Sequence, residues 1–227
     1  MTNTFNMFSL KTNGRRTGRM GKADREILRE VLPRFEIKSN GVIDPAEIFG
    51  RQAPLYVEIG FGNGDFLFEK TISTPDADFI GIDLYITGAA KLLKKFDQHK
   101  KTSDGLYREN LRIFVDDSRK VLERHIPDKS IDGIYILFPD PWPKKRHNKR
   151  RLVKPGFSRL IYSKLKNGGF VVTATDHHDY AEGIAESFST GFQPSKTDIS
   201  DIRKTKYAGR AIAEGRKLHV SSFRKVF

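Results

Sequence analysis

A carboxylate and three glycines stand together at the end of an apolar run. Glu58 lies two residues before Gly60, and Gly62 and Gly64 follow at alternate positions. In a Rossmann-type sheet, the turn after the first strand is glycine-rich because its backbone closely approaches a bound ligand. The G-x-G-x-G spacing differs from the G-x-G-x-x-G of most dinucleotide sites, and Glu58 would repel a pyrophosphate. The pattern therefore favours a nucleoside ligand that carries positive charge.

Three further apolar runs also end on carboxylates, namely Asp83, Asp117 and Asp140. The carboxyl ends of parallel strands meet at one edge of a sheet, and an acid about 20 residues after the glycines suits ribose hydroxyls. Acids at strand ends also cap helices, and Asp117 before Ser118 fits that role alone. Four such acids in a chain of net charge +13 favour a cationic ligand. S-adenosylmethionine (SAM) fits, because it has an ammonium, a sulfonium, a ribose and an exocyclic amine.

A basic run adjoins the acid at the end of the fourth apolar run. Residues 144 to 151 contain six cations in eight positions, and the sequence pI is near 9.8. Such clustering is typical of proteins that bind nucleic acids. The residues predicted to contact an RNA backbone are Arg146, Lys149, Arg150 and Arg151. A solvated surface and a nuclear-localisation signal are alternative interpretations. Trp142, just before the run, fits base stacking and core packing about equally.

The elements that must position these residues alternate between strand and helix after residue 54. Continuous apolar runs such as residues 134 to 138 predict strands buried on both faces. The clearest helix spans residues 87 to 96, with apolar residues on one face. A strand-like run near the C-terminus predicts a hairpin that completes the sheet. The expected fold is α/β, a Rossmann-like, doubly wound and mostly parallel seven-stranded sheet with a basic N-terminal extension.

Length and composition limit the organisation and the class of protein. With 227 residues, one core is expected: residues 1–40 as a flexible basic extension with a short helix, and 41–227 as the domain that contains the sheet. A transit peptide is an alternative for the first 22 residues. No apolar run approaches the roughly 20 residues of a membrane span, and the histidines lack metal-ligand spacing. The absence of cysteine fits a reducing, cytoplasmic location. A monomer and a homodimer both remain open.

Five motifs occur in a characteristic order. They are Val57-Glu58-Ile59-Gly60-Phe61-Gly62, Gly81-Ile82-Asp83, Asn110-Leu111-Arg112, Phe138-Pro139-Asp140-Pro141-Trp142-Pro143-Lys144-Lys145-Arg146-His147 and Ala174-Thr175-Asp176. Together they closely resemble the bacterial tRNA (guanine-N7)-methyltransferases, which modify a guanine of the tRNA variable loop. The resemblance covers roughly residues 50 to 227, and the fourth motif is the most specific. It implies that residues 41–227 form a SAM-dependent methyltransferase domain.

The resemblance implies roles for particular residues, with SAM as cofactor and tRNA as partner. Cofactor positions are Glu58, Gly60, Gly62, Asp83, Asp117 and Asp140. Substrate positions are Lys144, Asp176, Thr205, Lys206, Tyr207 and Ala208. Two residues depart from the family pattern: Ala208 stands where Glu is usual, and Asp83 is shorter than the commoner Glu. A contact to the target base is then missing or supplied elsewhere, for example by Asp176.

The chemistry of guanine N7 fits a site that lacks a strong base. N7 carries a lone pair and no proton, so the enzyme mainly aligns N7 with the methyl group. Asp140 is the expected catalytic residue, which aligns the guanine and stabilises positive charge that develops on the purine. The alternatives are another SAM-dependent RNA base methyltransferase and a non-catalytic RNA-binding protein. A nicotinamide oxidoreductase is disfavoured by the glycine spacing and by the acids.

Overall fold

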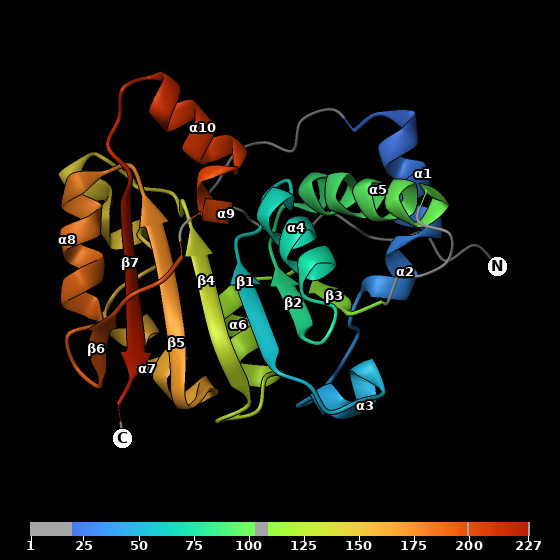
Figure 1. Cartoon of the computed structure of the whole chain (residues 1–227), viewed down its shortest axis with the longest axis horizontal. Helices are drawn as coiled ribbons and strands as arrows, with labels where there is room; N and C mark the ends of the chain where they lie inside the picture. The colour runs from blue at the N-terminus through green and yellow to red at the C-terminus, as the bar shows by residue number, and fades with distance from the viewer. Residues whose placement is uncertain (1–19, 103–108, 199, 227) are drawn as a thin grey trace.

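A seven-stranded sheet forms the centre of the molecule in the computed structural model, which describes residues 20–102, 109–198 and 200–226. The strand order is β3-β2-β1-β4-β5-β7-β6 (Figure 1). The strands are β1 (Leu55–Ile59), β2 (Asp78–Ile82), β3 (Leu111–Phe114), β4 (Ile131–Leu137), β5 (Leu165–Thr175), β6 (Phe192–Ser195) and β7 (His219–Lys225). The first five are parallel to their neighbours, whereas β7 pairs antiparallel with β5 and β6. The predicted fold, including the C-terminal hairpin, is confirmed.

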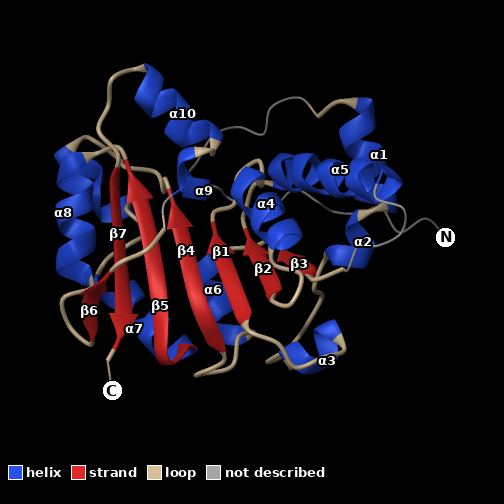
Figure 2. Ribbon diagram, viewed as in Figure 1, coloured by secondary structure: helices blue, strands red, loops and turns tan. Residues whose placement is uncertain are grey.

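Helices cover both faces of this sheet (Figure 2). Apolar residues of α6, α7 and α8 pack on one face, and those of α4 and α5 pack on the other. The helices are α1 (Lys22–Glu30), α2 (Leu32–Phe35), α3 (Pro45–Phe49), α4 (Asp65–Ser73), α5 (Ile86–Thr102), α6 (Ser118–Arg124), the 3₁₀ helix η1 (Lys145–Arg150), α7 (Pro155–Lys164), α8 (His178–Ser187), α9 (Ser200–Arg203) and α10 (Lys206–Ala213). Layers on both faces explain why the central strands read as continuous apolar runs.

The strand order has a switch point between β1 and β4, here called the crevice. The chain runs from β1 outward to β2 and β3, and then returns to β4 on the other side of β1. At such a switch point the loops after the two strands diverge, and ligands of open α/β sheets bind there, at the carboxyl ends of the strands. Glu58 on β1 and Asp140 just after β4 therefore flank the crevice.

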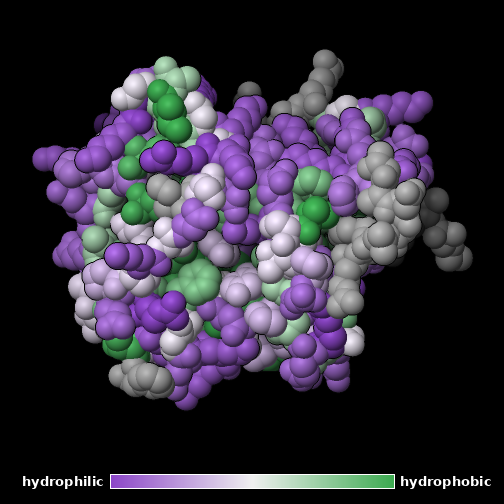
Figure 3. All heavy atoms as spheres, in the orientation of Figure 1, coloured by the Kyte–Doolittle hydropathy of each residue, from purple (hydrophilic) through white to green (hydrophobic). Residues whose placement is uncertain are grey.

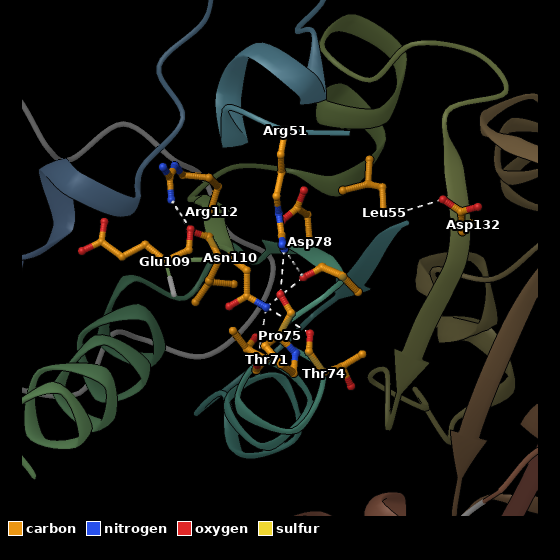
Figure 4. A network of polar contacts seen from close by, with 12 residues as sticks. Arg51, Leu55, Thr71, Thr74, Pro75, Asp78, Glu109, Asn110, Arg112 and Asp132 are labelled. Carbon is orange, nitrogen blue, oxygen red and sulfur yellow. Dashed lines mark hydrogen bonds and ion pairs between the residues drawn. The ribbon is translucent and has the colours of Figure 1, made fainter. Parts of the chain in front are cut away.

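The opposite edge of the sheet is held by a polar network (Figure 4). The Arg51 guanidinium binds the Asp78 carboxylate at the start of β2, with Nη2 to Oδ1 at 2.6 Å. The Asn110 side-chain amide donates to the carbonyls of Thr71, Thr74 and Ala77 at 3.2, 3.2 and 2.8 Å. Asn110 thus ties β3 to the α4–β2 connection. Its place in the Asn110-Leu111-Arg112 motif has a structural explanation, since these bonds satisfy buried carbonyls.

The described part of the N-terminal extension packs against the domain. α1 and α2 contact α5, and Glu36 forms an isolated parallel bridge with Ile113 at the outer strand β3. Pro33 lies in the first turn of α2, where the missing N–H of proline costs no helical bond. Residues 1–19 lie outside the described residues. The domain division at residue 40 stays a prediction.

The visible surface is mostly hydrophilic (Figure 3). Apolar atoms gather at the tip of α10 in this view, and α10 carries two of the large exposed hydrophobic side chains, Tyr207 and Ile212. No described helix is long and apolar enough to cross a membrane. Within the described ranges, no cluster of three or more His, Cys, Asp or Glu side chains has the geometry of a metal site.

Candidate active site

The turn after β1 is built by its glycines. Gly60, Gly62 and Gly64 have φ of 78, 55 and 71°, a left-handed conformation that side chains other than glycine rarely adopt. Gly88, in the first turn of α5, lies against this turn, because a Cβ added there would be 1.9 Å from the Gly62 carbonyl oxygen. The sequence pattern therefore fixes both the shape of the turn and its packing on α5.

Glu58 is a buried carboxylate with an unsatisfied oxygen. Only 4% of the residue is exposed, and Oε2 has no hydrogen-bond partner among the described residues. Burial raises the pKa of Glu58 to about 8, and the charges of Asp83 and Asp65 add to this increase. A buried acceptor without a partner is costly. Its position beside the glycine turn fits a ligand that brings a cation or a donor.

Asp83 connects β2 to the glycine turn. Its Oδ2 accepts a hydrogen bond from the Gly62 amide at 2.7 Å, and its Oδ1 accepts one from the Tyr85 amide at 2.8 Å. Burial raises the pKa of Asp83 and these backbone bonds oppose the increase, while the charge of Asp140 raises it further. Each carboxylate oxygen keeps a lone pair for a ligand hydroxyl. The structure thus brings Glu58, Asp83 and Asp140 into one electrostatic cluster.

Asp117 forms the N-cap of α6. Its Oδ1 accepts from the amides of Arg119 at 2.9 Å and Lys120 at 3.2 Å. This is the capping role that the sequence offered as an alternative. Asp117 lies between β3 and α6 at the same sheet edge, and a cofactor contact through its second oxygen stays a prediction.

Asp140 is exposed in a constrained loop after β4. Phe138 donates its amide to the Ala174 carbonyl at 2.7 Å, which continues the β4–β5 pairing by one residue. Phe138 and Trp142 have φ of 52 and 43°, which is unfavourable for bulky residues. Asp140 thus lies in a strained, proline-flanked loop at the carboxyl end of β4.

One predicted substrate residue, Tyr207, lies over the crevice. The residue is 49% exposed, and its ring stacks on Phe138 at a centroid distance of 6.0 Å and an interplanar angle of 21°. A Cβ added to Gly62 would lie 3.7 Å from Tyr207 Cε2. The neighbouring Lys206 is exposed at the start of α10. These contacts place α10 beside the glycine turn and the Asp140 loop.

Three other predicted substrate residues are engaged within the protein. The Thr205 hydroxyl donates to the Ile202 carbonyl at 2.8 Å and accepts from the Ala208 amide at 3.2 Å. Ala208 is fully buried and Thr205 is 7% exposed, so both support α10 instead of facing a ligand. Asp176 forms an ion pair with Arg216 through Oδ2. In the structure, the Asp176 carboxylate is therefore paired with Arg216 and is not free to replace the usual glutamate.

The basic run forms a mostly exposed surface next to Asp140. Lys144, Arg146, Lys149 and Arg150 are all exposed on η1 or at its start. The Arg150 guanidinium lies 4.9 Å from the centroid of the Trp142 ring. Arg151 differs from the prediction of a phosphate contact, because it is only 8% exposed.

Sequence reasoning missed two charged residues of the site. Asp65 follows the glycine turn directly, forms an ion pair with Lys95 and adds to the charge that raises the pKa of Glu58. Its position right after Gly64 was a signal for it. Arg216, the partner of Asp176, follows α10 and had no local signal, because the pairing depends on tertiary structure.

Comparisons with known proteins agree with this arrangement. A family model described as putative methyltransferase matches residues 52–220. A tRNA (guanine-N(7)-)-methyltransferase of Nitrosococcus oceani is 41% identical over 88% of this chain and 84% of its own length. One of Alkalilimnicola ehrlichii is 34% identical over 93% and 90%.

Solved structures share the fold at low sequence identity. The 16S rRNA methyltransferase KamB has a TM-score of 0.60 at 14% identity, over 84% of this chain and 97% of that one. A 16S rRNA (adenine(1408)-N(1))-methyltransferase from Catenulisporales acidiphilia, solved with SAM, has a TM-score of 0.53 at 14% identity, over 82% and 92%.

The sheet order, the glycine turn and the acids at the strand ends define a class I SAM-dependent methyltransferase. SAM is accordingly the methyl donor. Within this class, the chain belongs to the tRNA (guanine-N(7)-)-methyltransferase family.

Proposed function

We propose that this protein transfers the methyl group of SAM to N7 of a guanine in the variable loop of tRNA, in the cytoplasm. The observation that carries the proposal is the buried, unpartnered Glu58 oxygen beside a glycine turn, at the same sheet edge as the Asp140 loop and its basic run. Family membership adds the substrate, because the relatives are named for guanine N7 of tRNA.

The cofactor is held by residues of three strand ends. Glu58 is proposed to accept from the ammonium of the methionine moiety, which would satisfy its buried oxygen. Asp83 is proposed to bind the ribose hydroxyls, and Asp117 the adenine amine. Gly60 and Gly62 have no side chain, which leaves room for close approach of the ligand to the turn. Bound SAM supplies an electrophilic methyl group on its sulfonium.

Asp140 is proposed to act on the guanine. N7 needs no deprotonation, so the chain's residues have to orient the base and stabilise its developing positive charge. The Asp140 carboxylate stands at the mouth of the crevice and close enough to Asp83 to affect its pKa. Tyr207 and Lys206 are proposed to contact the base and its nucleotide from α10, and Lys144 from the Asp140 loop.

The exposed cations of η1 are proposed to bind tRNA phosphates. Arg146, Lys149 and Arg150 adjoin the Asp140 loop. An RNA strand bound to these cations would therefore run past the crevice. Arg151 is excluded from this set because it is buried.

Methyl transfer to unmodified tRNA tests the function. Purified protein, SAM and unmodified total tRNA should yield 7-methylguanosine in nucleoside analysis. A tRNA transcript that carries 7-deazaguanine is the matched control, because it lacks only the accepting nitrogen. Methylation of ribosomal RNA but not tRNA would favour another RNA base methyltransferase, and tRNA binding without transfer would favour a non-catalytic protein.

A further inference from the structure

Arg151 is the buried member of the basic run. It is 8% exposed, whereas Lys144, Lys145, Arg146, Lys149 and Arg150 are exposed. Removing a guanidinium from water is costly unless its donors are satisfied inside the protein. The position of Arg151 must therefore be explained by its internal contacts, and an RNA phosphate has little access to it.

Those contacts join separate segments of the chain. Arg151 Nε donates to the Pro141 carbonyl at 2.8 Å, and Nη2 binds Asp179 Oδ2 at 2.5 Å. The guanidinium carbon lies 4.8 Å from the centroid of the buried Tyr180 ring, a cation–π distance. The hydrogen bond from Arg151 holds the pKa of Asp179 below its ordinary value, so this partner stays charged.

The Pro141 carbonyl lies between Asp140 and a strained part of the loop. Pro141 directly follows Asp140, and Trp142 after it has a φ of 43°. A non-glycine residue keeps such a conformation only where surrounding contacts hold it. Arg150 and His147 contact the Trp142 ring, and the bond from Arg151 holds the backbone at Pro141. It anchors the backbone between the proposed catalytic carboxylate and the strained tryptophan.

The other end of the link lies on a second loop of the site. Asp179 and Tyr180 belong to the first turn of α8, which begins two residues after Asp176. Arg151 thus connects the loop after β4 with the helix that follows β5. Asp140 follows β4, and Asp176, a substrate residue predicted from the sequence, follows β5 at the same sheet edge.

We propose that Arg151 is a positioning residue for methyl transfer, which fixes the Asp140 loop against the first turn of α8 and does not bind tRNA. The inference rests on the proposed function of Asp140. A displacement of about 1 Å at a reacting group can reduce a rate by about 100-fold, so loss of this anchor should reduce the chemical step more than binding.

The experiment measures rate, binding and loop environment in one set of variants. Arg151→Met removes both hydrogen bonds, Arg151→Lys keeps the charge, and Asp179→Asn weakens only the ion pair. Arg159→Met on exposed α7 is the control for loss of one cation, and Lys149→Met is the contrast for loss of a proposed phosphate contact. Trp142 is the chain's only tryptophan, so its fluorescence reports on the loop directly.

For Arg151→Met, we measure the rate of single-turnover methylation at saturating SAM and tRNA and divide it by the concentration of SAM-binding sites. We expect this normalised rate to fall by about 30- to 100-fold. Its tRNA Kd and salt dependence should stay within about twofold of wild type, and Trp142 emission should shift. Arg151→Lys should recover part of the rate, and Asp179→Asn should lose less than Arg151→Met. Lys149→Met should instead weaken tRNA binding and reduce its salt slope by roughly 0.7–0.9.

Two results of the rate and binding measurements would overturn the inference. One is a wild-type rate per SAM-binding site in Arg151→Met, which would leave Arg151 with a role in stability alone. The other is a reduced salt slope with an unchanged saturating rate, which would make Arg151 a phosphate contact. If Arg151→Met does not fold, the rates of Arg151→Lys and Asp179→Asn decide in the same way. If the wild-type protein does not methylate tRNA, the proposed function fails, whereas an unchanged Trp142 emission in Arg151→Met contradicts the anchor itself.

Discussion

Glu58 is buried at the crevice with an oxygen that no described residue contacts. Burial raises its pKa from 4.5 to about 8, so the folded, ligand-free protein holds this proton more tightly than the unfolded chain does. Folding is then favoured at low pH, and this contribution is lost as the pH rises from about 4.5 through about 8. The buried charge of Glu58 therefore destabilises the ligand-free protein at high pH, and a bound ammonium can offset this loss.

Glu58→Gln should remove this pH dependence. The variant and wild type should be equally stable near pH 4.5, and the ligand-free variant should be more stable by about 2–4 kcal/mol above pH 8. Denaturant unfolding across this pH range measures the difference. SAM affinity should fall in the same variant, because the neutral amide lacks the charge that holds an ammonium. A difference in stability that is independent of pH would contradict the assignment.

Asp140 is the residue on which turnover should depend most. Asp140→Asn keeps the size but removes the charge, and Asp140→Ala removes both. Single-turnover methylation should fall from wild type to Asn to Ala, and the charge should account for about 2.7–4 kcal/mol, or roughly 100- to 1,000-fold. Binding of tRNA should fall much less. Because Asp140 is exposed, melting temperatures should change little; a parallel loss of stability and rate would instead indicate a structural role.

The types of these residues were predictable from the sequence, but their partners were not. Apolar runs that end on acids predicted Glu58, Asp83 and Asp140 at one edge, because strand direction alone sets that geometry. The bond from Asp83 to the Gly62 amide depends on tertiary structure. It implies that Asp83→Ala would loosen the glycine turn as well as remove a ribose contact.

At the scale of elements, the glycine turn and α5 constrain each other. Gly88 leaves no room for a side chain, because a Cβ there would meet the Gly62 carbonyl at 1.9 Å. Backbone atoms cannot move aside as a flexible side chain can, so α5 or the turn would have to shift.

Gly88→Ala should therefore displace the turn. We expect about 1–3 kcal/mol of lost stability and at least about a tenfold loss of SAM affinity in calorimetry. Gly183→Ala in α8 is the matched control, because nothing lies within 4 Å of an added Cβ there. The control should gain about 0.4–1 kcal/mol from helix propensity and bind SAM normally. Normal SAM binding by Gly88→Ala would show that the turn tolerates the shift.

Elements with strong periodicity were predicted well, and those that depend on tertiary contacts were not. The parallel strands and α5 followed from apolar runs and helical spacing. The start of β5 at Leu165 has no signal in the sequence, because Asn167, Gly168 and Gly169 are typical of a turn. These residues lie in a bulge between Leu165 and Phe170, which pair with Ile131 and Gly133 of β4. Arg151 was likewise grouped with its exposed neighbours because a charge run has no periodicity that marks a buried member.

At the scale of the whole molecule, the net charge of +13 attracts RNA without specifying where it binds. The acids at the crevice form a negative region within this positive surface. A polyanion should therefore be held by the cations around the crevice, while SAM enters between the carboxylates. The described cations nearest the Asp140 loop in sequence are those of η1.

Neutralising Arg146, Lys149 and Arg150 together should test whether η1 carries the phosphate contacts. If each cation releases counterions on binding, the log–log slope of tRNA affinity against salt should fall by roughly 2–3. SAM affinity should stay unchanged, because Glu58 and Asp83 hold the cofactor on the other side of the crevice. The matched control neutralises Arg124, Arg159 and Lys196, which are exposed on other elements and lower the net charge by the same amount. Titrations at several salt concentrations compare the two proteins. An equal loss of slope in both would attribute binding to overall charge, whereas an unchanged slope in the η1 variant would place the RNA on another surface.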